Sequence, residues 1–300
     1  MSGRFSGDDW GVILGGSSGF GLATAQKLAA HGMNLCIVHR DRRGAMKRIE
    51  PEFDKLRASG VKLILENDDA LDAEVRGRIL GQLAEQMGPN GRVKMLLHSI
   101  AFGNLKLIVP ELPKPDAGVA VAKLADALGI AKEALAGAVD KLAAEGVDEL
   151  TELSTAPAYP THSLLDWVQD VFQRGQFARD ARVFGLTSEG NEVAWKGYAA
   201  VSAAKVALEA TARSIATEFG PHGIRCNVLQ PGVTDTPALQ AIPGSERLKA
   251  HSRLRNPLRR LTTPPDVANV LYLLCLPEAA WINGTVIRID GGERIAGSTT

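Results

Sequence analysis

The stretch that decides the fold is Trp10-Gly-Val-Ile-Leu-Gly15-Gly-Ser-Ser-Gly19-Phe-Gly21, in which a short apolar run passes through a glycine-rich turn into a helical pattern. Glycines allow the backbone to turn tightly and to approach a phosphate closely. The first turn of the following helix then offers free N–H groups and a positive dipole to the same phosphate. The stretch therefore predicts the first strand, the phosphate-binding turn and the first helix of a dinucleotide-binding unit.

Further apolar runs follow, and they are short and bounded by Gly, Asn or charged residues. They are Leu35 to Val38, Val61 to Leu65, Val93 to Leu97, Val183 to Leu186, Ile224 to Leu229 and Val286 to Ile289. Such runs are typical of strands that are buried on both faces of a parallel sheet. Helical patterns alternate with them, as over residues 22–30 and 198–219. We expect an α/β fold, a Rossmann-like doubly wound parallel sheet, built by residues 1–300 as a single NAD(P)-binding domain.

The alternation is interrupted between the fourth and fifth expected strands, where about 85 residues separate Ala101 from Leu186. We assign residues 104–160 to a mainly helical insertion. Within it, residues 116–150 carry apolar side chains at three-to-four spacing on both sides of Gly129, which predicts an inserted helical hairpin. Prolines flank the hairpin at both ends. Two roles stay open for it: packing on the surface, or covering the substrate.

Composition limits the classes of partner. The chain has 34 basic and 34 acidic residues, so no net field attracts nucleic acid or an anionic membrane. Its three cysteines, Cys36, Cys226 and Cys275, suit buried thiols in a reducing compartment and have no metal-ligand spacing. The N-terminus lacks an apolar signal core, and no stretch approaches the length of a membrane span. We expect a cytoplasmic enzyme without a metal site.

The end of the second expected strand bears on the choice of cofactor. It reads Val38-His39-Arg40-Asp41-Arg42-Arg43. NAD sites commonly present an acidic side chain to the ribose hydroxyls, whereas a 2′-phosphate calls for a cation. Arg40 can offer a paired donor to that phosphate. We expect NADPH rather than NADH; the alternative is that the arginines form a solvated cluster that Asp41 partly neutralises.

The most specific spacing joins Tyr198 to Lys205, seven residues later in Tyr198-Ala-Ala-Val-Ser-Ala-Ala-Lys205. Two helical turns cover about seven residues, so the two side chains share a face. In this spacing, and from Val12 to Gly292 apart from the insertion, the chain resembles the enoyl-acyl carrier protein reductases of the short-chain dehydrogenase/reductase superfamily. Ordinary members of that superfamily carry the tyrosine four residues before the lysine, where this chain has Val201.

Three further segments resemble stations of the same family. His98-Ser99-Ile100-Ala101-Phe102 is similar to the run at the end of the fourth strand of enoyl reductases, and Pro231-Gly232-Val233-Thr-Asp-Thr236 to the segment that clasps the nicotinamide. Asn67-Asp68 stands where the family places an Asp-Val pair against the adenine. The resemblance implies these cofactor-binding residues: Gly15, Ser17, Ser18, Gly19, Phe20, Gly21, Arg40, Asn67, Asp68, Ser99, Ile100, Ala101, Lys205, Pro231, Gly232, Val233 and Thr236.

The resemblance also implies the chemistry, which is reduction of the carbon-carbon double bond of a trans-2-enoyl thioester on acyl carrier protein or coenzyme A, in fatty-acid or related acyl-chain synthesis. Tyr198 would stabilise the developing charge on the thioester oxygen, and Lys205 would hold the nicotinamide ribose. Ser188 stands where many enoyl reductases have a second tyrosine and ordinary members a catalytic serine. Residues from Thr236 to Glu246 would border the acyl chain. Relatives are commonly tetramers, so a homo-oligomer is expected.

Two other classes of function stay open. The first is a ketone or alcohol oxidoreductase of the same superfamily, which Ser188 favours and Val201 opposes. The second is a non-catalytic nucleotide-binding protein, which the retention of both Tyr198 and Lys205 opposes. Turnover assays separate the three classes.

Overall fold

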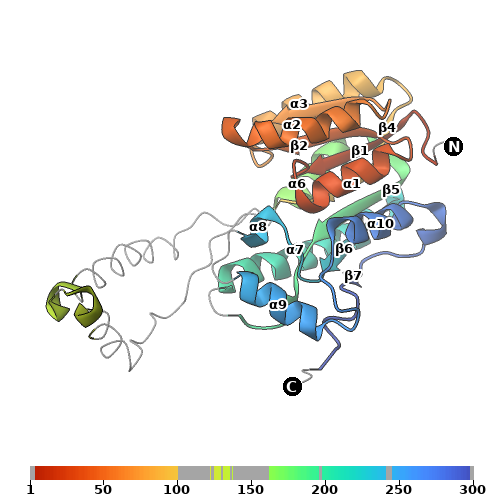
Figure 1. Ribbon diagram of the computed structural model, residues 1–300. Coiled ribbons are helices and arrows are strands. Elements are labelled where there is room, and N and C mark those ends of the chain that lie inside the picture. Colours follow the sequence, from red (N-terminus) through yellow and green to blue (C-terminus); the bar gives the residue numbers. More distant parts are fainter. Residues whose placement is uncertain are drawn as a thin grey trace.

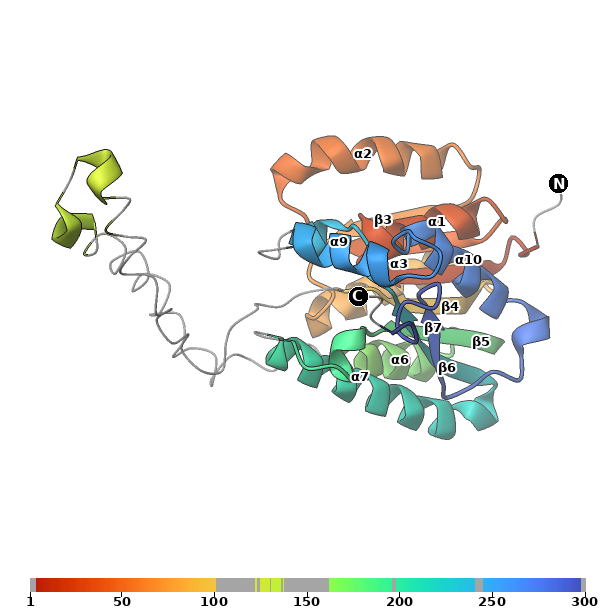
Figure 2. The same cartoon turned by 60° about the horizontal axis from the view of Figure 1, so that its bottom comes forward.

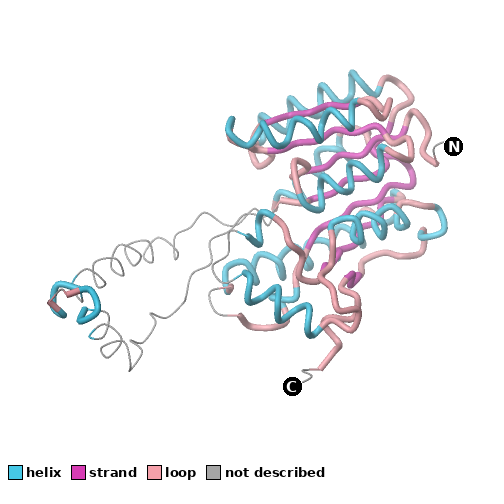
Figure 3. Tube along the Cα trace, viewed as in Figure 1, coloured by secondary structure: helices cyan, strands magenta, loops and turns pink. Residues whose placement is uncertain are grey.

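The structure is a computed structural model, and it describes residues 4–100, 122, 125–129, 131–135, 137, 162–195, 198–240 and 245–297. Within these residues, seven strands lie side by side in one sheet, and all neighbouring pairs are parallel (Figures 1 and 3). The strands are β1 (Asp9–Leu14), β2 (Asn34–His39), β3 (Leu63–Asn67), β4 (Arg92–His98), β5 (Phe177–Leu186), β6 (Ile224–Pro231) and β7 (Val286–Ile289). The expected Rossmann-like sheet is confirmed.

The strand order is β3-β2-β1-β4-β5-β6-β7, so the chain first builds outward from β1 and then returns to its other side at β4. Leu14 at the end of β1 pairs with Val38 of β2 on one side and with His98 of β4 on the other. In doubly wound sheets, ligands bind in the crevice outside the carboxyl ends of strands at such a reversal. The glycine-rich turn after Leu14 lies at this point.

Helices cover both faces of the sheet. They are α1 (Gly19–Ala29), α2 (Arg43–Arg57), α3 (Ala73–Met87), α6 (Ser163–Gln173), α7 (Ala199–Glu218), α8 (Pro237–Gln240), α9 (Ser245–Arg255) and α10 (Pro264–Leu274), with short 3-10 turns η2 (Glu189–Asn191), η3 (Gly220–His222) and η4 (Pro277–Ala279). Figure 2 shows α6 and α7 on one side of the sheet and α1 and α2 on the other.

Each face of the sheet has its own apolar core. On one face, Trp167 of α6 and Leu208 of α7 pack in a cluster with Val12 of β1. On the other, Phe53 of α2 packs in a cluster with Ile13, the next residue of the same strand. Alternate residues of a strand point to opposite faces, so an unbroken apolar run is required where both faces are covered. This is why the expected runs became strands.

Two strands differ from the expected runs. β3 begins two residues later and continues to Asn67, because Glu66 and Asn67 pair with the end of β2. β5 begins at Phe177, well before the apolar run that starts at Val183. Before that run it contains Arg182, which is 1% exposed and pairs with Asp180, whose side chain is 37% exposed. An ion pair of a buried arginine thus takes the place of apolar side chains there, and an apolar pattern cannot reveal it.

Residues 99–162 separate β4 from α6 in the chain, and α6 is the crossover helix to β5. Most of the expected insertion, residues 104–160, lies outside the described residues. Within the described part, residues 125–128 and 132–135 are helical, and Gly129 between them has a φ of 65°. Among the described helices, none combines the length and the apolar character needed to cross a membrane.

Candidate active site

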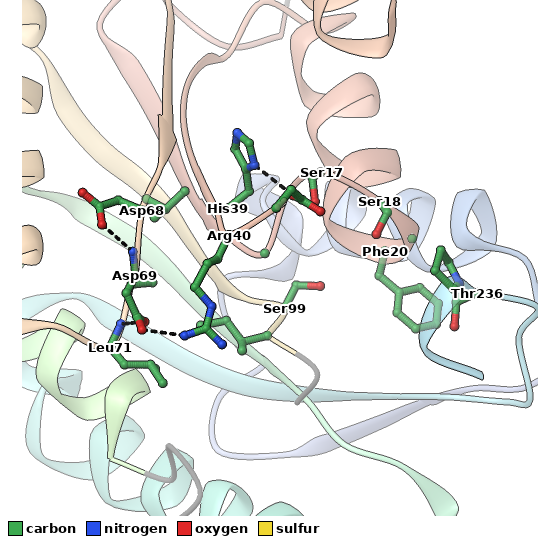
Figure 4. A pocket seen from close by; sticks show the side chains of 17 residues that line it. Ser17, Ser18, Phe20, His39, Arg40, Asp68, Asp69, Leu71, Ser99 and Thr236 are labelled. Carbon is green, nitrogen blue, oxygen red and sulfur yellow. Dashed lines mark hydrogen bonds and ion pairs between the residues drawn. The ribbon is translucent and has the colours of Figure 1, made fainter. Parts of the chain in front are cut away.

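A pocket of about 360 Å³ opens at the carboxyl ends of the central strands (Figure 4). Its walls come from the turn after β1, from the ends of β2 to β4 and from the start of α8. The lining residues are Gly15, Ser17, Ser18, Gly19, Phe20, Val38, His39, Arg40, Asp41, Asp68, Asp69, Ala70, Leu71, Ser99, Ile100, Thr236 and Pro237. Ten of these lining residues are among the expected cofactor-binding residues, namely Gly15, Ser17, Ser18, Gly19, Phe20, Arg40, Asp68, Ser99, Ile100 and Thr236.

The glycine-rich turn has the geometry that its sequence requires. Gly15 has a φ of 86°, and a Cβ at this position would come within 2.5 Å of the carbonyl oxygen of Ser99. Gly19 has a φ of 54° and opens α1. Ser18 caps that helix without a side-chain hydrogen bond, and the first turn contains no acidic residue. A phosphate-bearing group therefore fits here, because helix N-termini offer unsatisfied N–H groups.

Gly21 and Asn67 belong to the predicted site but do not line the pocket. Gly21 is buried, and a side chain on it would collide with the backbone of Gly15, so it permits the turn. The Asn67 side chain instead accepts a hydrogen bond from the backbone N–H of Asp41 at 2.9 Å and donates one to the carbonyl of Asp41 at 3.1 Å. Asn67 therefore fixes the end of β2, and it is not among the residues that line the pocket.

Arg40 lies in the pocket and is paired with a carboxylate that the sequence analysis did not single out. Its Nη1 is 2.6 Å from Oδ2 of Asp69, and the two side chains point toward each other (Figure 4). Oδ1 of Asp69 also accepts a hydrogen bond from the backbone N–H of Leu71 at 3.0 Å. Asp41 was the residue expected to neutralise part of the arginine cluster, and its Oδ2 lies 2.9 Å from Nδ1 of His39. Asp69 directly follows the predicted Asn67-Asp68 pair in the sequence, and this adjacency is the signal that could have identified it as a pocket residue.

The second part of the site lies at the carboxyl end of β5 and the start of α7. Tyr198 is the residue before the first turn of α7, and its hydroxyl is 2.8 Å from the hydroxyl of Ser188. A side chain on Gly190 would collide with the Tyr198 ring. The ring of Trp195 lies 5.6 Å from that of Tyr198 at an angle of 56°. Tyr198 is therefore held between a glycine and an aromatic side chain, with its hydroxyl at Ser188.

Lys205 projects from α7 toward the same strand end. Its Nζ donates a hydrogen bond to the carbonyl of Leu186, the last residue of β5, at 2.8 Å. Burial lowers the pKa of Lys205 to about 8, against the opposing effect of the Glu209 carboxylate. Glu209 also accepts hydrogen bonds from Thr187 and Asn191, on either side of Ser188. One helix thus carries the tyrosine and the lysine and fixes the serine loop.

His98 is a buried neutral group next to the pocket. Its Nε2 is 2.6 Å from Oγ of Ser163, the first residue of α6. Burial, with a smaller effect from Lys205, lowers the pKa of His98 to about 3. The hydrogen bond joins the end of β4 to the start of α6. Ser99 and Ile100, which follow His98, line the pocket, whereas Ala101 lies outside the described residues.

The predicted segment after β6 is divided between two places. Thr236 lines the pocket, while Pro231, Gly232 and Val233 do not. Gly232 is tightly packed, since a Cβ there would come within 2.6 Å of Oγ1 of Thr262. Tyr198, Lys205 and Ser188 also lie outside the pocket lining. The described residues therefore form an open pocket at the carboxyl ends of β1 to β4 and a separate hydroxyl and ammonium cluster at β5 and α7.

Comparison with known families identifies a match over residues 121–293, which is more than half of the chain. The matching family model is described as enoyl-(acyl carrier protein) reductase. The match includes β5, β6, β7 and the helix that carries Lys205, but not the glycine-rich turn.

Three relatives differ in the binding or catalytic activity that their names state. The chain is 27% identical over 280 residues to the cyclic-di-GMP-binding biofilm dispersal mediator protein of Escherichia coli, covering 93% of this chain and 94% of the relative. It is 28% identical over 284 residues to 3-oxoacyl-(acyl-carrier-protein) reductase MabA of Mycobacterium tuberculosis, covering 94% and 91%. It is 37% identical to the NADH-dependent enoyl-(acyl-carrier-protein) reductase FabI of E. coli, but over only 111 residues, 37% of this chain and 42% of the relative.

Solved structures share the fold. An enoyl-(acyl-carrier-protein) reductase of Anaplasma phagocytophilum in complex with NAD superposes with a TM-score of 0.70 at 19% identity, covering 100% of this chain and 96% of that one. A short-chain dehydrogenase of Burkholderia cenocepacia in complex with NADP superposes with a TM-score of 0.69 at 21% identity, covering 97% and 99%.

Proposed function

The chain belongs to the short-chain dehydrogenase/reductase superfamily, in the family whose model is described as enoyl-(acyl carrier protein) reductase, and on this premise we propose that it is an NADPH-dependent reductase of trans-2-enoyl thioesters. The observation that carries the proposal is the position of Tyr198. Tyr198 is the residue before α7, and its hydroxyl lies 2.8 Å from the hydroxyl of Ser188. Val201, one helical turn later, stands where ordinary members of the superfamily have the tyrosine.

The cofactor would be held by the pocket at the central strand ends. The turn from Gly15 to Gly19 and the first turn of α1 have the donors that a pyrophosphate needs. Arg40 supplies the cation for a 2′-phosphate, with its charge partly balanced by Asp69. Relatives and structural neighbours include NAD- and NADP-bound proteins, so the choice of NADPH depends on Arg40. When bound, the nicotinamide supplies the hydride for the β-carbon.

The chain's own residues act on the charge that the reduction creates. As the double bond is lost, negative charge develops on the thioester oxygen. Tyr198 turns its hydroxyl hydrogen to that oxygen, and Ser188 donates to the tyrosine oxygen in return. The Lys205 ammonium, whose Nζ donates to the carbonyl of Leu186, stabilises the negative charge at the Tyr198 hydroxyl and the thioester oxygen. The α-carbon of the resulting enolate then takes a proton from water, and the product is the saturated acyl thioester.

A second candidate is a 3-ketoacyl thioester reductase. The Ser188 and Tyr198 pair supports it, because the same two hydroxyls can polarise a ketone, and so does the similarity to MabA over most of the chain. The absence of a tyrosine at position 201 argues against it. The two candidates differ in substrate, so NADPH oxidation is assayed side by side with enoyl and 3-ketoacyl thioesters of equal chain length. Turnover of the enoyl series supports the proposal, and turnover of the ketoacyl series alone contradicts it.

The biological setting proposed for this activity is acyl-chain synthesis in the cytoplasm, by a homo-oligomer that takes its substrate on acyl carrier protein or coenzyme A. Comparing the kcat/KM of the two thioester carriers, together with light scattering of the purified protein, tests these finer points.

A further inference from the structure

Arg255, the last residue of α9, binds two carboxylates from distant parts of the chain. Its Nη1 and Nη2 donate to Glu189 at 2.9 and 2.6 Å, and Nη2 also donates to Glu293 at 3.0 Å. Glu189 directly follows Ser188 and begins η2, whereas Glu293 lies in the turn after β7. One guanidinium therefore joins α9, the serine loop and the C-terminal turn.

The two carboxylates depend on this arginine because both are removed from water. Glu293 is 1% exposed and Glu189 is 9% exposed. Buried carboxylates need a cation or hydrogen-bond donors, and a pair of them without one is strongly unfavourable. The other nearby cation is Arg294, whose Nε is 3.9 Å from Glu189 and whose Nη2 pairs with Glu192 at 3.2 Å. Among the described residues, Arg255 alone forms ion pairs with both Glu189 and Glu293.

The connection extends to the loop after β6. Oε2 of Glu293 accepts a hydrogen bond from the backbone N–H of Val233 at 3.2 Å. A Cβ on Gly232 would come within 2.8 Å of the same oxygen. Gly232 and Val233 belong to the segment expected at the nicotinamide. Arg255 therefore reaches that segment through Glu293 and the catalytic serine through Glu189.

We propose that Arg255 is a positioning residue, which fixes the positions of Ser188 and of the Gly232-Val233 segment relative to α9. The proposal rests on the proposed function only for the identity of the substrate. α9 begins at Ser245, within residues 236–246 that are expected to border the acyl chain, so its last turn links the substrate side of the site to the reacting hydroxyls. A bidentate guanidinium fixes orientation as well as charge, which an ammonium does not.

The test compares three variants with a matched control. Arg255→Gln removes the cation, Arg255→Lys keeps the charge without the fork, and Arg255→Gln/Glu293→Gln removes one carboxylate as well while keeping an acceptor for Val233. Arg253→Gln makes the same change at an exposed position of the same helix. We measure kcat, KM and hydrogen-deuterium exchange of residues 187–192 in each protein.

Arg255→Gln should lower kcat by roughly ten- to hundredfold with a much smaller change in the KM of NADPH, because small displacements of reacting groups are costly. The loss is expected because two carboxylates left without their cation repel each other and displace the serine loop and the Gly232-Val233 segment. Arg255→Gln/Glu293→Gln removes this repulsion and should recover part of kcat. Arg255→Lys should have a kcat between those of the unmutated protein and Arg255→Gln. Hydrogen-deuterium exchange of residues 187–192 should be fastest in the variant that loses the most kcat.

The proposal is overturned if Arg255→Gln matches Arg253→Gln in kcat and in exchange, or if only the melting temperature falls. If Arg255→Gln does not fold, Arg255→Lys and the double variant decide, since both avoid two unpaired carboxylates. Failure of the proposed function is seen separately, in the substrate preference of the unmutated protein. If that protein reduces only ketoacyl thioesters, the same kcat comparison is made on them, and the exchange measurement requires no turnover.

Discussion

The hydroxyl of Tyr198 lies 2.8 Å from the hydroxyl of Ser188, although the tyrosine stands one helical turn before its ordinary position relative to Lys205. The displacement is accommodated because Tyr198 precedes the first turn of α7 and packs against Gly190. A tyrosine moved along the helix thus still meets the serine at the end of β5. The pair could serve a carbon-carbon or a carbon-oxygen double bond, so the substrate pocket and not the pair alone separates the two reactions.

Tyr198→Phe should keep the fold and NADPH binding but lower kcat for enoyl thioesters. The lost hydrogen bond is made mainly in the transition state, and removing such a donor typically costs ~10²- to 10³-fold. Ser188→Ala should cost less, because Tyr198 still reaches the oxygen. Steady-state kinetics of both variants check this, with cofactor binding as the control for folding. Full activity of Tyr198→Phe across the enoyl series would remove the tyrosine from the mechanism.

Gly190→Ala should impair turnover although it replaces no catalytic side chain. A Cβ at this position collides with the Tyr198 ring, so the ring must move and its hydroxyl leaves Ser188. We expect a loss of kcat of about tenfold or more. Gly44→Ala is the matched control, because a Cβ at Gly44 meets nothing within 4 Å. Equal kinetics of the two variants would show that the ring position is not critical.

The pH dependence of kcat/KM should report Lys205. Its pKa is lowered to about 8 by burial, so the ammonium is present below that pH and is lost above it. We therefore expect a plateau up to about pH 8 and then a decline approaching about tenfold per pH unit. Lys205→Arg, which stays charged, should be slower but without this decline. A decline at the same pH in Lys205→Arg would assign the titration to another group.

Arg40→Ala should weaken NADPH more than NADH, by about tenfold, because a charge-assisted contact to the 2′-phosphate is lost. Asp69→Asn should have the opposite effect of a few-fold, since it releases Arg40 from an exposed ion pair of about 0.2 to 1 kcal/mol. Direct titration with both cofactors measures the ratio without turnover. Equal changes for NADPH and NADH in Arg40→Ala would refute the phosphate assignment.

The sequence predicted the parts of this molecule that depend on local pattern. The apolar runs became the strands, and the glycine turn after Leu14 formed with the positive φ at Gly15 that it needs. The 2.8 Å contact of Ser188 with Tyr198 was not derivable, because spacing along a helix does not give the distance to a strand end. Helix periodicity placed Tyr198 and Lys205 on one face and no further.

Long-range ion pairs account for most of what was missed. Asp69 meets Arg40 from a different strand end, and Arg255 meets Glu189 and Glu293 across separations of 66 and 38 residues. Such pairs carry no local signature, since each partner alone resembles a solvated charge. They become visible only when the fold brings the strand ends together.

The most direct test of the account is the identity of the product. The protein is incubated with a trans-2-butenoyl thioester and NADPH that carries deuterium at the transferring position of the nicotinamide, and the acyl product is analysed by mass spectrometry and NMR. The account predicts a saturated butanoyl thioester with a single deuterium at the β-carbon. Recovery of unchanged butenoyl thioester, under conditions in which the 3-oxobutanoyl thioester is reduced to its 3-hydroxy product, would contradict it.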